Sequence, residues 1–370
     1  MGRVNSLAAS TASPATTTTQ ARYAPPRFSA RGPISSTILN ALACGIRAAG
    51  DSLGDLEHST RVAIAASPDI VRDDDLQLAL LILHGLHYGG VVESDDDWEW
   101  HPALVAARVA IERAFEAELR RQVPVPELPN PSAEDVAAAL FELTKPTAGP
   151  SFSRYVARKA SEEHLREYLV LRSVYTLKEA DAQTWAVPRL PARAKAALME
   201  IQTDEYGAGD PERMHSAIFA RAMRGLGLDD RYGSYIDCVP AVTIASFTMM
   251  TMFGLNRSLR GATAGHFSAY EMTSSIPNRY IAQGVRRLGF SDDIAWYFDE
   301  HVEADAVHEQ IAGRDLSGGL AEAEPSLLAD IMWGANCSLL VDGWGSAEAL
   351  AHWEAGRSAL RVPMPSGAER

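Results

Sequence analysis

The sequence predicts an all-α protein. Apolar residues recur at helical spacing along most of the chain, and no run of alternating strands with hairpin turns appears. The chain is rich in Ala and its basic residues are mostly Arg, two residue types that favour helices. With 370 residues, of which 46% are hydrophobic and 22% charged, the chain can bury the core of an ordinary globular protein. We therefore expect a helical bundle.

The N-terminal part divides into a tail and a helical region. Residues 1–31 are rich in Ser, Thr, Ala and Pro and lack the apolar run of a secretory signal, which predicts a disordered tail. Residues 32–125 form an N-terminal helical region, with helices expected over 33–49, 74–87 and 101–123. We expect this region to mediate a homodimer.

A proline-dense linker at residues 126–131 separates this region from a larger helical domain, because proline cannot continue a helix. Ser132 is a suitable N-cap, followed by two acidic residues in the first turn. The larger domain is expected over 132–346 and a C-terminal tail over 347–370. Helices are predicted in it over residues 132–145, 161–183, 191–206, 211–226, 241–261, 262–276, 293–312 and 324–340.

Charge and cysteine content narrow the function classes. The formal charge of −14 argues against a nucleic-acid surface, which needs clustered Lys and Arg. The three cysteines are far apart and form no CxxC pair, which favours buried thiols in a reducing cytoplasm. Residues 238–256 carry no charge and nearly reach the length of a membrane span, but Pro240 and several Ser and Thr favour a buried helix. We expect a cytoplasmic protein that binds neither nucleic acid nor membrane.

One predicted helix carries three metal-ligand side chains on a single face. His301, Asp305 and His308 lie at i, i+4 and i+7, so at about 100° per residue Asp305 and His308 both project within about 40° of His301. Such a set can hold one metal ion or one end of a pair. A solvated acidic helix is the alternative, because four further acids occupy the same segment.

Other predicted helices offer acids that suit the same site. Glu271 is the only acid in an otherwise apolar and small-residue stretch, where a charge is costly unless it is paired or bound to metal. Glu205 ends one helix and His215 enters the next, so the two can converge across a glycine turn. Both are also compatible with a polar surface. Glu179 is a weaker candidate because Lys178 beside it suits a surface position.

The charges of these residues favour a two-metal site. Four buried carboxylates would repel one another strongly without cations, and two divalent ions would balance them. Carboxylate and imidazole ligands without thiolate suit iron or manganese better than structural zinc. The predicted metal ligands are Glu179, Glu205, His215, Glu271, His301, Asp305 and His308.

At these residues the sequence resembles the haem-oxygenase-like di-iron oxidases, an all-helical family that binds two irons in place of haem. The family's His-x3-Asp-x2-His element corresponds to His301, Asp305 and His308. Its second core helix supplies a Glu, matching Glu271, and its first supplies a Glu and a His, matching Glu205 and His215. The resemblance covers roughly residues 150–345 and implies a haem-oxygenase-like bundle.

Two features of the chain resemble those of the N-oxygenating members of this family. In this pattern the chain is closest to the N-oxygenase of streptozotocin biosynthesis. The spacing between Glu205 and His215 is long, and Glu179 is a further upstream acid. The chain departs from that enzyme because too few residues follow position 345 for its cupin domain.

The resemblance implies that two Fe(II) ions bind O₂ and form a peroxo-di-iron(III) intermediate. That species would oxygenate an amine or guanidine-type nitrogen of a small metabolite to hydroxylamine or nitro, in specialised metabolism, with an external electron donor. Two alternatives remain open. One is a di-iron oxidase that acts on carbon by desaturation or C–C cleavage, and the other is a non-catalytic helical binding protein.

Overall fold

The computed structural model describes residues 27–49, 53–89, 91–146 and 149–365, and for residues 303–306 it describes the backbone alone. All regular structure in these ranges is helical, which confirms the all-α prediction. Most of the predicted N-terminal tail lies outside the described residues. Among the described helices, none combines the length and the apolar character needed to cross a membrane.

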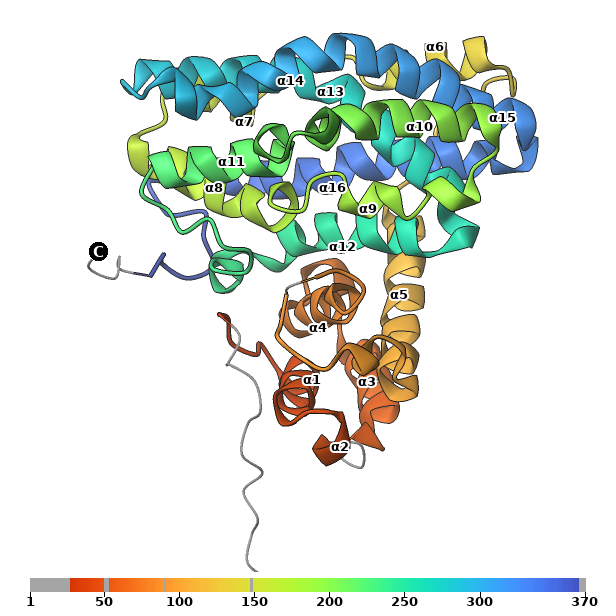
Figure 1. Ribbon diagram of the computed structural model, residues 1–370, viewed down its shortest axis with the longest axis vertical. Helices are drawn as coiled ribbons and strands as arrows, with labels where there is room; N and C mark the ends of the chain where they lie inside the picture. Colours follow the sequence, from red (N-terminus) through yellow and green to blue (C-terminus); the bar gives the residue numbers. More distant parts are fainter. Residues whose placement is uncertain (1–26, 50–52, 90, 147–148, 366–370) are drawn as a thin grey trace, which may run out of the picture.

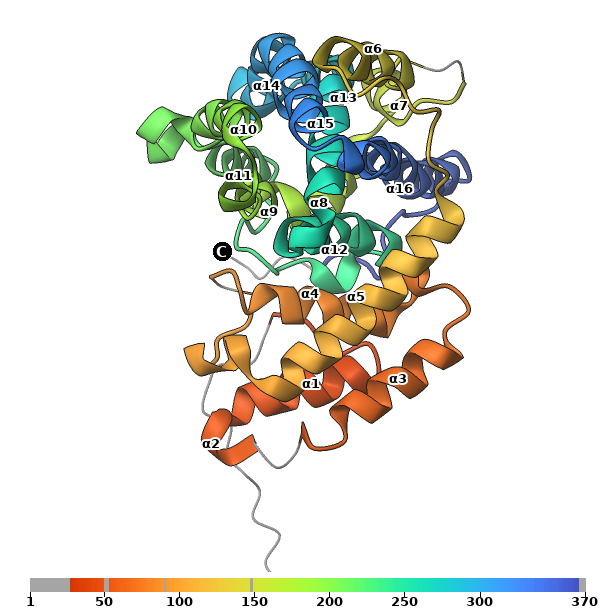
Figure 2. The ribbon, with the colours of Figure 1, turned by 90° about the vertical axis from the view of Figure 1, so that its right-hand side faces the viewer.

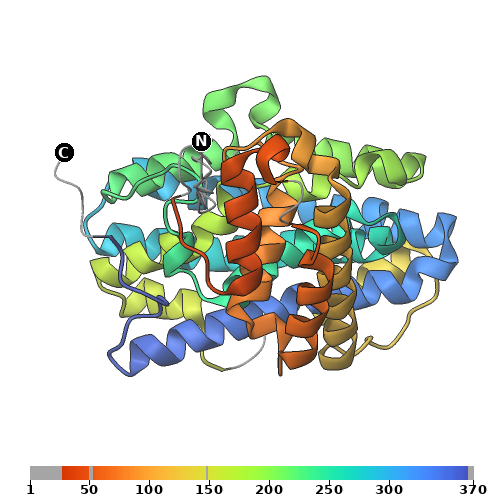
Figure 3. The ribbon, with the colours of Figure 1, turned by 90° about the horizontal axis from the view of Figure 1, so that it is seen from below.

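The N-terminal helices form a layer beneath the long helices of the rest of the chain and run across them (Figures 1 and 3). Asp75 ties this layer together, because its carboxylate accepts the backbone N–H groups of Ile34 and Ser35 at 2.8 Å each. The helices of the layer are α1 (Pro33–Cys44), α2 (Ile46–Ala49), α3 (Leu56–Ala66), α4 (Asp74–Gly85) and α5 (Pro102–Gln122).

The remaining helices form the bundle that carries the predicted ligands. Figure 2 shows it with α10 and α11 on one side, α16 on the other and α13 and α14 above. Its helices are α6 (Ala133–Leu143), α7 (Phe152–Arg158), α8 (Glu162–Thr176), α9 (Asp181–Thr184), α10 (Ala192–Glu205), α11 (His215–Gly225), α12 (Ala241–Leu255), α13 (Arg260–Arg287), α14 (Asp292–Gln310), α15 (Gly319–Ala323) and α16 (Leu328–Glu354).

The uncharged segment forms α12, which is a buried helix as predicted. It lies between the N-terminal layer and the rest of the bundle and packs against α4, α13 and α16 (Figure 1). One apolar core continues from the N-terminal helices through α12 into the bundle. Cys238 and Cys337 are buried thiols and Cys44 is partly buried.

Glycines let α13 and α16 approach until their backbones touch. A Cβ on Gly265 would lie 1.8 Å from the carbonyl oxygen of Ile331, and a Cβ on Gly334 would lie 2.2 Å from that of Ala262. No other residue fits at either position without moving one helix. This contact fixes α13, the helix that carries Glu271, against α16.

The structure extends two helices beyond their predicted ends. Helix α13 continues through Pro277 to Arg287, because Ile281 and Val285 bury their side chains in the core. Helix α16 continues through residues 347–354, which were expected to begin a C-terminal tail, because Leu350 and Trp353 are buried. In both cases tertiary packing outweighs the local signal.

A π-helical segment, η9 (Ile311–Gly318), follows α14 without a break. It packs against α6, α10 and α13. The buried Ser268 hydroxyl donates to the carbonyl oxygen of Ala312 at 2.7 Å and lies 2.8 Å from the Ser317 hydroxyl. These bonds help to satisfy a segment whose backbone pairing departs from that of an α-helix.

Candidate metal centre

A tight glycine turn brings Glu205 and His215 together. Glu205 is the last residue of α10 and His215 the first of α11. Gly207 and Gly209 have φ of +70° and +90°, which favour glycine, and a Cβ on Gly207 would lie 2.7 Å from the backbone nitrogen of Met214. The loop between the two helices therefore returns to the end of α10 and places His215 Nδ1 3.0 Å from Glu205 Oε2. The predicted convergence across the turn is present.

Helices α13 and α14 supply the opposite side of the centre. Glu271 is 5% exposed, although it is charged and sits among apolar neighbours on α13. His301 and His308 are both buried on one face of α14. His308 Nδ1 lies 3.3 Å from Glu271 Oε2. The two histidines thus project from one face of the helix, as predicted. Because both are buried, the alternative of a solvated acidic helix does not apply to them.

Glu179 also points into the centre, which its surface-like sequence context argued against. It follows α8 in a turn where Ala180 has a left-handed φ of +73°. The Tyr297 hydroxyl lies 2.9 Å from both carboxylate oxygens of Glu179 and donates to them. His301 Nε2 lies 3.6 Å from Glu179 Oε1.

These side chains form two groups that share one residue. The first group is Glu179, Glu205, His215 and His301, and the second is Glu205, Glu271 and His308. Within each group the ligand atoms lie within 4.8 Å of one another, and every member is buried. The structure therefore brings together six of the seven predicted ligands, with Glu205 between the groups. The seventh, Asp305, has its side chain outside the described residues.

The donor atoms fit a metal pair. His301 Nδ1 lies 2.7 Å from the carbonyl oxygen of Tyr297, a contact that places the proton on Nδ1 and leaves the lone pair of Nε2 facing Glu179. His215 Nδ1 is buried and makes no aligned hydrogen bond, although Glu205 is close. A buried imidazole nitrogen this close to a carboxylate oxygen suits a cation, which takes the place of the imidazole proton when metal binds. Oxygen and imidazole donors without thiolate suit iron.

The electrostatics of the metal-free centre also favour the binding of cations. Burial lowers the pKa of His215, but the charge of Glu205 outweighs burial and raises the pKa to about 9. Burial also opposes charge on His308, and Glu271 and Asp204 raise its pKa to about 9. Burial raises the pKa of Glu271, with Glu205 adding to the rise. Without metal, protonated histidines take the place of cations among these carboxylates.

Two further residues, Asp204 and Tyr297, support the candidate ligands and were not predicted from the sequence. Asp204 Oδ2 lies 3.1 Å from His308 Nε2, on the opposite side of the ring from Glu271. Tyr297 holds Glu179, as described above. A signal for Tyr297 existed, because it lies one helical turn before His301. None existed for Asp204, whose partner is more than a hundred positions away.

No curated protein matches the chain. A family model described as iron-containing redox enzyme matches residues 166–343. The matched segment runs from α8 into α16 and contains both metal-ligand groups together with Asp305. This portion of the chain is thus similar to the iron-containing redox enzymes, which supports an oxidoreductase with the haem-oxygenase-like helical fold.

Proposed function

We propose that this protein is a non-haem di-iron oxygenase that uses O₂ to oxygenate an amine or guanidine-type nitrogen of a small metabolite. The observation that carries the proposal is Glu205, which belongs to both buried ligand groups. A carboxylate between two groups can bridge two ions, whereas two unrelated sites would not share a residue.

The chain's own residues would bind and orient the metals. Tyr297 fixes the Glu179 carboxylate, and Asp204 fixes the His308 ring. Two iron ions held here would activate O₂, which provides the oxygen atom for the substrate. Oxygenation of an amine to a hydroxylamine with release of one water consumes two electrons and two protons, so an external electron donor is required.

The position of Glu179 favours nitrogen over carbon as the atom attacked. Among the related oxidases described above, an extra upstream carboxylate is a feature of the N-oxygenating members. Glu179 lies inside the first ligand group, buried and held by Tyr297. Had it pointed to solvent, the carbon-acting alternative would be the better proposal.

The test is metal loading followed by exposure to O₂. The protein is loaded anaerobically with Fe(II), and bound iron is counted by mass spectrometry. We expect two ions per chain, and far less than two in Glu205→Gln, because both groups lose a shared ligand. Glu200→Gln, an exposed change on the same helix, is the matched control and should load like the wild type.

Exposure of the loaded protein to O₂ should give a transient visible absorption band. His308→Ala should abolish the band while the circular dichroism of the helices is retained. An unchanged band in His308→Ala, or full loading of Glu205→Gln, would refute the centre. Full loading of Glu179→Gln would remove the support for nitrogen and leave the carbon-acting oxidase as the better assignment.

A further inference from the structure

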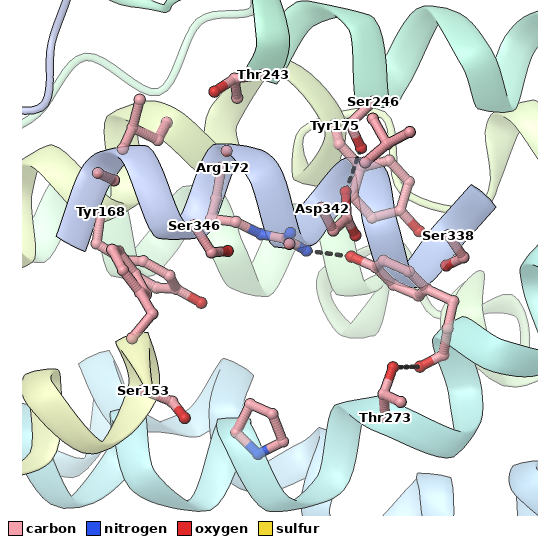
Figure 4. Close-up of a pocket in the computed structure, with 18 of the residues that line it drawn as sticks. Ser153, Tyr168, Arg172, Tyr175, Thr243, Ser246, Thr273, Ser338, Asp342 and Ser346 are labelled. Atoms are coloured by element: carbon pink, nitrogen blue, oxygen red, sulfur yellow. Dashed lines mark hydrogen bonds between the residues drawn. The ribbon is translucent and has the colours of Figure 1, made fainter. Parts of the chain in front are cut away.

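A cavity of about 370 Å³ lies beside the metal centre and is lined by residues of α7, α8, α12, α13 and α16 (Figure 4). Tyr270 lines the cavity, and the next residue, Glu271, belongs to the second ligand group. Tyr175 lines it as well, with its ring 5.3 Å from that of Tyr270. Burial raises the pKa of Tyr175, and Tyr270, Glu179, Glu205 and Glu271 add to the rise. The cavity and the centre thus share a wall of two tyrosines.

Arg172 is the one cationic side chain among the described residues that line the cavity. It donates a hydrogen bond to the Tyr270 hydroxyl and lies 5.6 Å from the ring of Tyr175 and 5.8 Å from that of Tyr270. No described residue places a carboxylate oxygen within 4 Å of its guanidinium; Arg31, by contrast, pairs with Asp74 at 2.8 Å. A shielded guanidinium without a carboxylate partner is costly. Its remaining donors suit an anionic ligand.

Asp342 is the one carboxylate among the described lining residues. Its Oδ1 accepts a hydrogen bond from the Ser246 hydroxyl at 2.5 Å. Figure 4 shows the Arg172 side chain extending toward Asp342, so the two opposite charges occupy the same part of the cavity. They are not in contact, however, and do not form an ion pair. Both side chains line the same cavity, so a ligand that carries both charges could pair with each of them.

Tyr270 adds a third polar contact at this end. Its hydroxyl oxygen accepts from Arg172, so its own O–H remains free to donate. The rest of the lining is neutral and includes apolar residues such as Leu171, Val242 and Ile281. Such a lining leaves room for a small side chain beyond the charged end.

We propose that this cavity is the substrate site and that the substrate is a free α-amino acid. Its carboxylate accepts from Arg172 and Tyr270, and its ammonium group donates to Asp342. An α-amino acid carries both charges on adjacent atoms, which matches an arginine and an aspartate that face the same small space. This inference rests on the proposed function, since it names the substrate class of the same centre.

The binding test uses metal-free protein and a named set of probes. The twenty common L-amino acids are screened by thermal shift, and those that raise the melting temperature are measured by calorimetry. Each binder is then compared with its decarboxylated amine and its N-acetyl derivative. We expect each derivative to bind about 10- to 100-fold more weakly, because each leaves one charged partner unpaired.

Two variants test which side chain binds the carboxylate of the amino acid and which binds its ammonium group. Arg172→Gln should reduce amino-acid affinity by about the same factor and remove the preference over the decarboxylated amine. Asp342→Asn should remove the preference over the N-acetyl derivative. Arg166→Gln on the same helix as Arg172, which pairs with Glu162 outside the cavity, and Asp330→Asn on the same helix as Asp342 are the matched controls. Both controls should bind like the wild type.

Several outcomes would overturn the proposal. They are a screen with no binder, decarboxylated amines that bind as well as the amino acids, or an Arg172→Gln variant with unchanged preference. The comparison of probes on the wild type decides the question even if a variant does not fold. Because metal is absent, binding of an amino acid together with failure of iron loading would show an amino-acid site without the proposed oxygenase function.

Discussion

The side chains of the centre are held by neighbours as well as by one another. His308 lies between Glu271 on one ring nitrogen and Asp204 on the other. His301 is oriented by the carbonyl oxygen of Tyr297, whose hydroxyl in turn holds Glu179. A metal-binding imidazole whose second nitrogen is fixed in this way keeps its lone pair directed at the metal. The geometry of the ligands is therefore set before any metal binds.

We predict that Asp204→Ala weakens metal binding about 10- to 100-fold, because the His308 ring loses the partner that orients it. The dissociation constant for Co(II) or Fe(II), measured by competition with a coloured chelator, provides the measurement. Glu200→Gln on the same helix serves as the control. An Asp204→Ala protein with wild-type affinity would show that the contact with His308 has no positioning role.

We also predict that metal binding releases protons at neutral pH. His215 and His308 have pKa values raised to about 9, so at pH 7 both carry protons that a metal must displace. Apparent affinity should therefore rise as pH increases toward 9. Calorimetry at pH 7 in buffers with different ionisation enthalpies gives the number of protons released, and a value of zero would contradict the prediction.

The same pKa shifts set the pH dependence of the metal-free fold. A histidine whose pKa is raised on folding contributes stability that is fully present below its ordinary value of 6.5 and is lost as pH rises through about 9. The melting temperature of metal-free protein should accordingly lose this contribution between those pH values. His215→Ala should remove the part that belongs to that residue.

At the scale of elements, close helix contacts position the ligands. Helix α13 carries Glu271 and is locked to α16 by its own Gly265 and by Gly334 of α16. The two glycines face backbone, so neither site can relax by moving a side chain. Placement of the second ligand group thus depends on residues that touch no ligand.

We predict that Gly334→Ala destabilises the protein by at least about 1–3 kcal/mol, since its Cβ would lie 2.2 Å from a carbonyl oxygen. Gly343→Ala on the same helix meets nothing within 4 Å. That control should be neutral or stabilising by up to about 1 kcal/mol, because alanine favours helices. Chemical denaturation of both variants provides the measurement, and equal stabilities would show that the contact is looser than described.

The sequence best predicted which residues lie at the candidate centre where one helix carried the information. The spacing of His301 and His308 and the isolation of Glu271 are local features, and all three residues are buried at the centre. Glu179 was ambiguous because its direction depends on the left-handed turn at Ala180. Asp204 was not foreseen, because its partner comes from a distant helix. Local periodicity fixes a face, whereas pairing between helices is decided by packing.

Helix ends were harder to predict for the same reason. Pro277 signals a helix end because it lacks an N–H, at a cost of about 3 kcal/mol inside a helix. Burial of Ile281 and Val285 beyond it offsets that cost. The energy that decides the boundary comes from residues that are not neighbours of the proline.

At the scale of the whole molecule, the N-terminal layer is joined to the bundle by a buried polar contact. Glu112 on α5 lies 2.8 Å from His84 Nε2 on α4 and accepts from the side chain of Asn256, at the end of α12, at 3.2 Å. Although burial raises the pKa of Glu112, the bond to His84 outweighs it and leaves the pKa lowered. One carboxylate thus links three helices, two from the layer and one from the bundle.

We predict that Glu112→Ala lowers stability by about 1–3 kcal/mol, because His84 and Asn256 lose their acceptor in a buried position. Glu116→Ala on the exposed side of the same helix removes only a surface pair with Arg120 and should change stability by less than about 1 kcal/mol. Thermal or urea unfolding compares the two. Similar losses in both variants would mean that the buried contact does not join the layer to the bundle.

The π-helical segment η9 affects the direction in which side chains project along the α14–η9 helix. A turn of this kind holds one residue more than an α-turn, so every side chain after it is rotated by roughly 100° relative to an uninterrupted helix. Gly318, which packs on Ala133, is the last residue of this segment, so its direction relative to the histidine face of α14 is set by the π-helical pairing. Loss of a residue from η9 would change that direction and turn one of the two faces away from its partner.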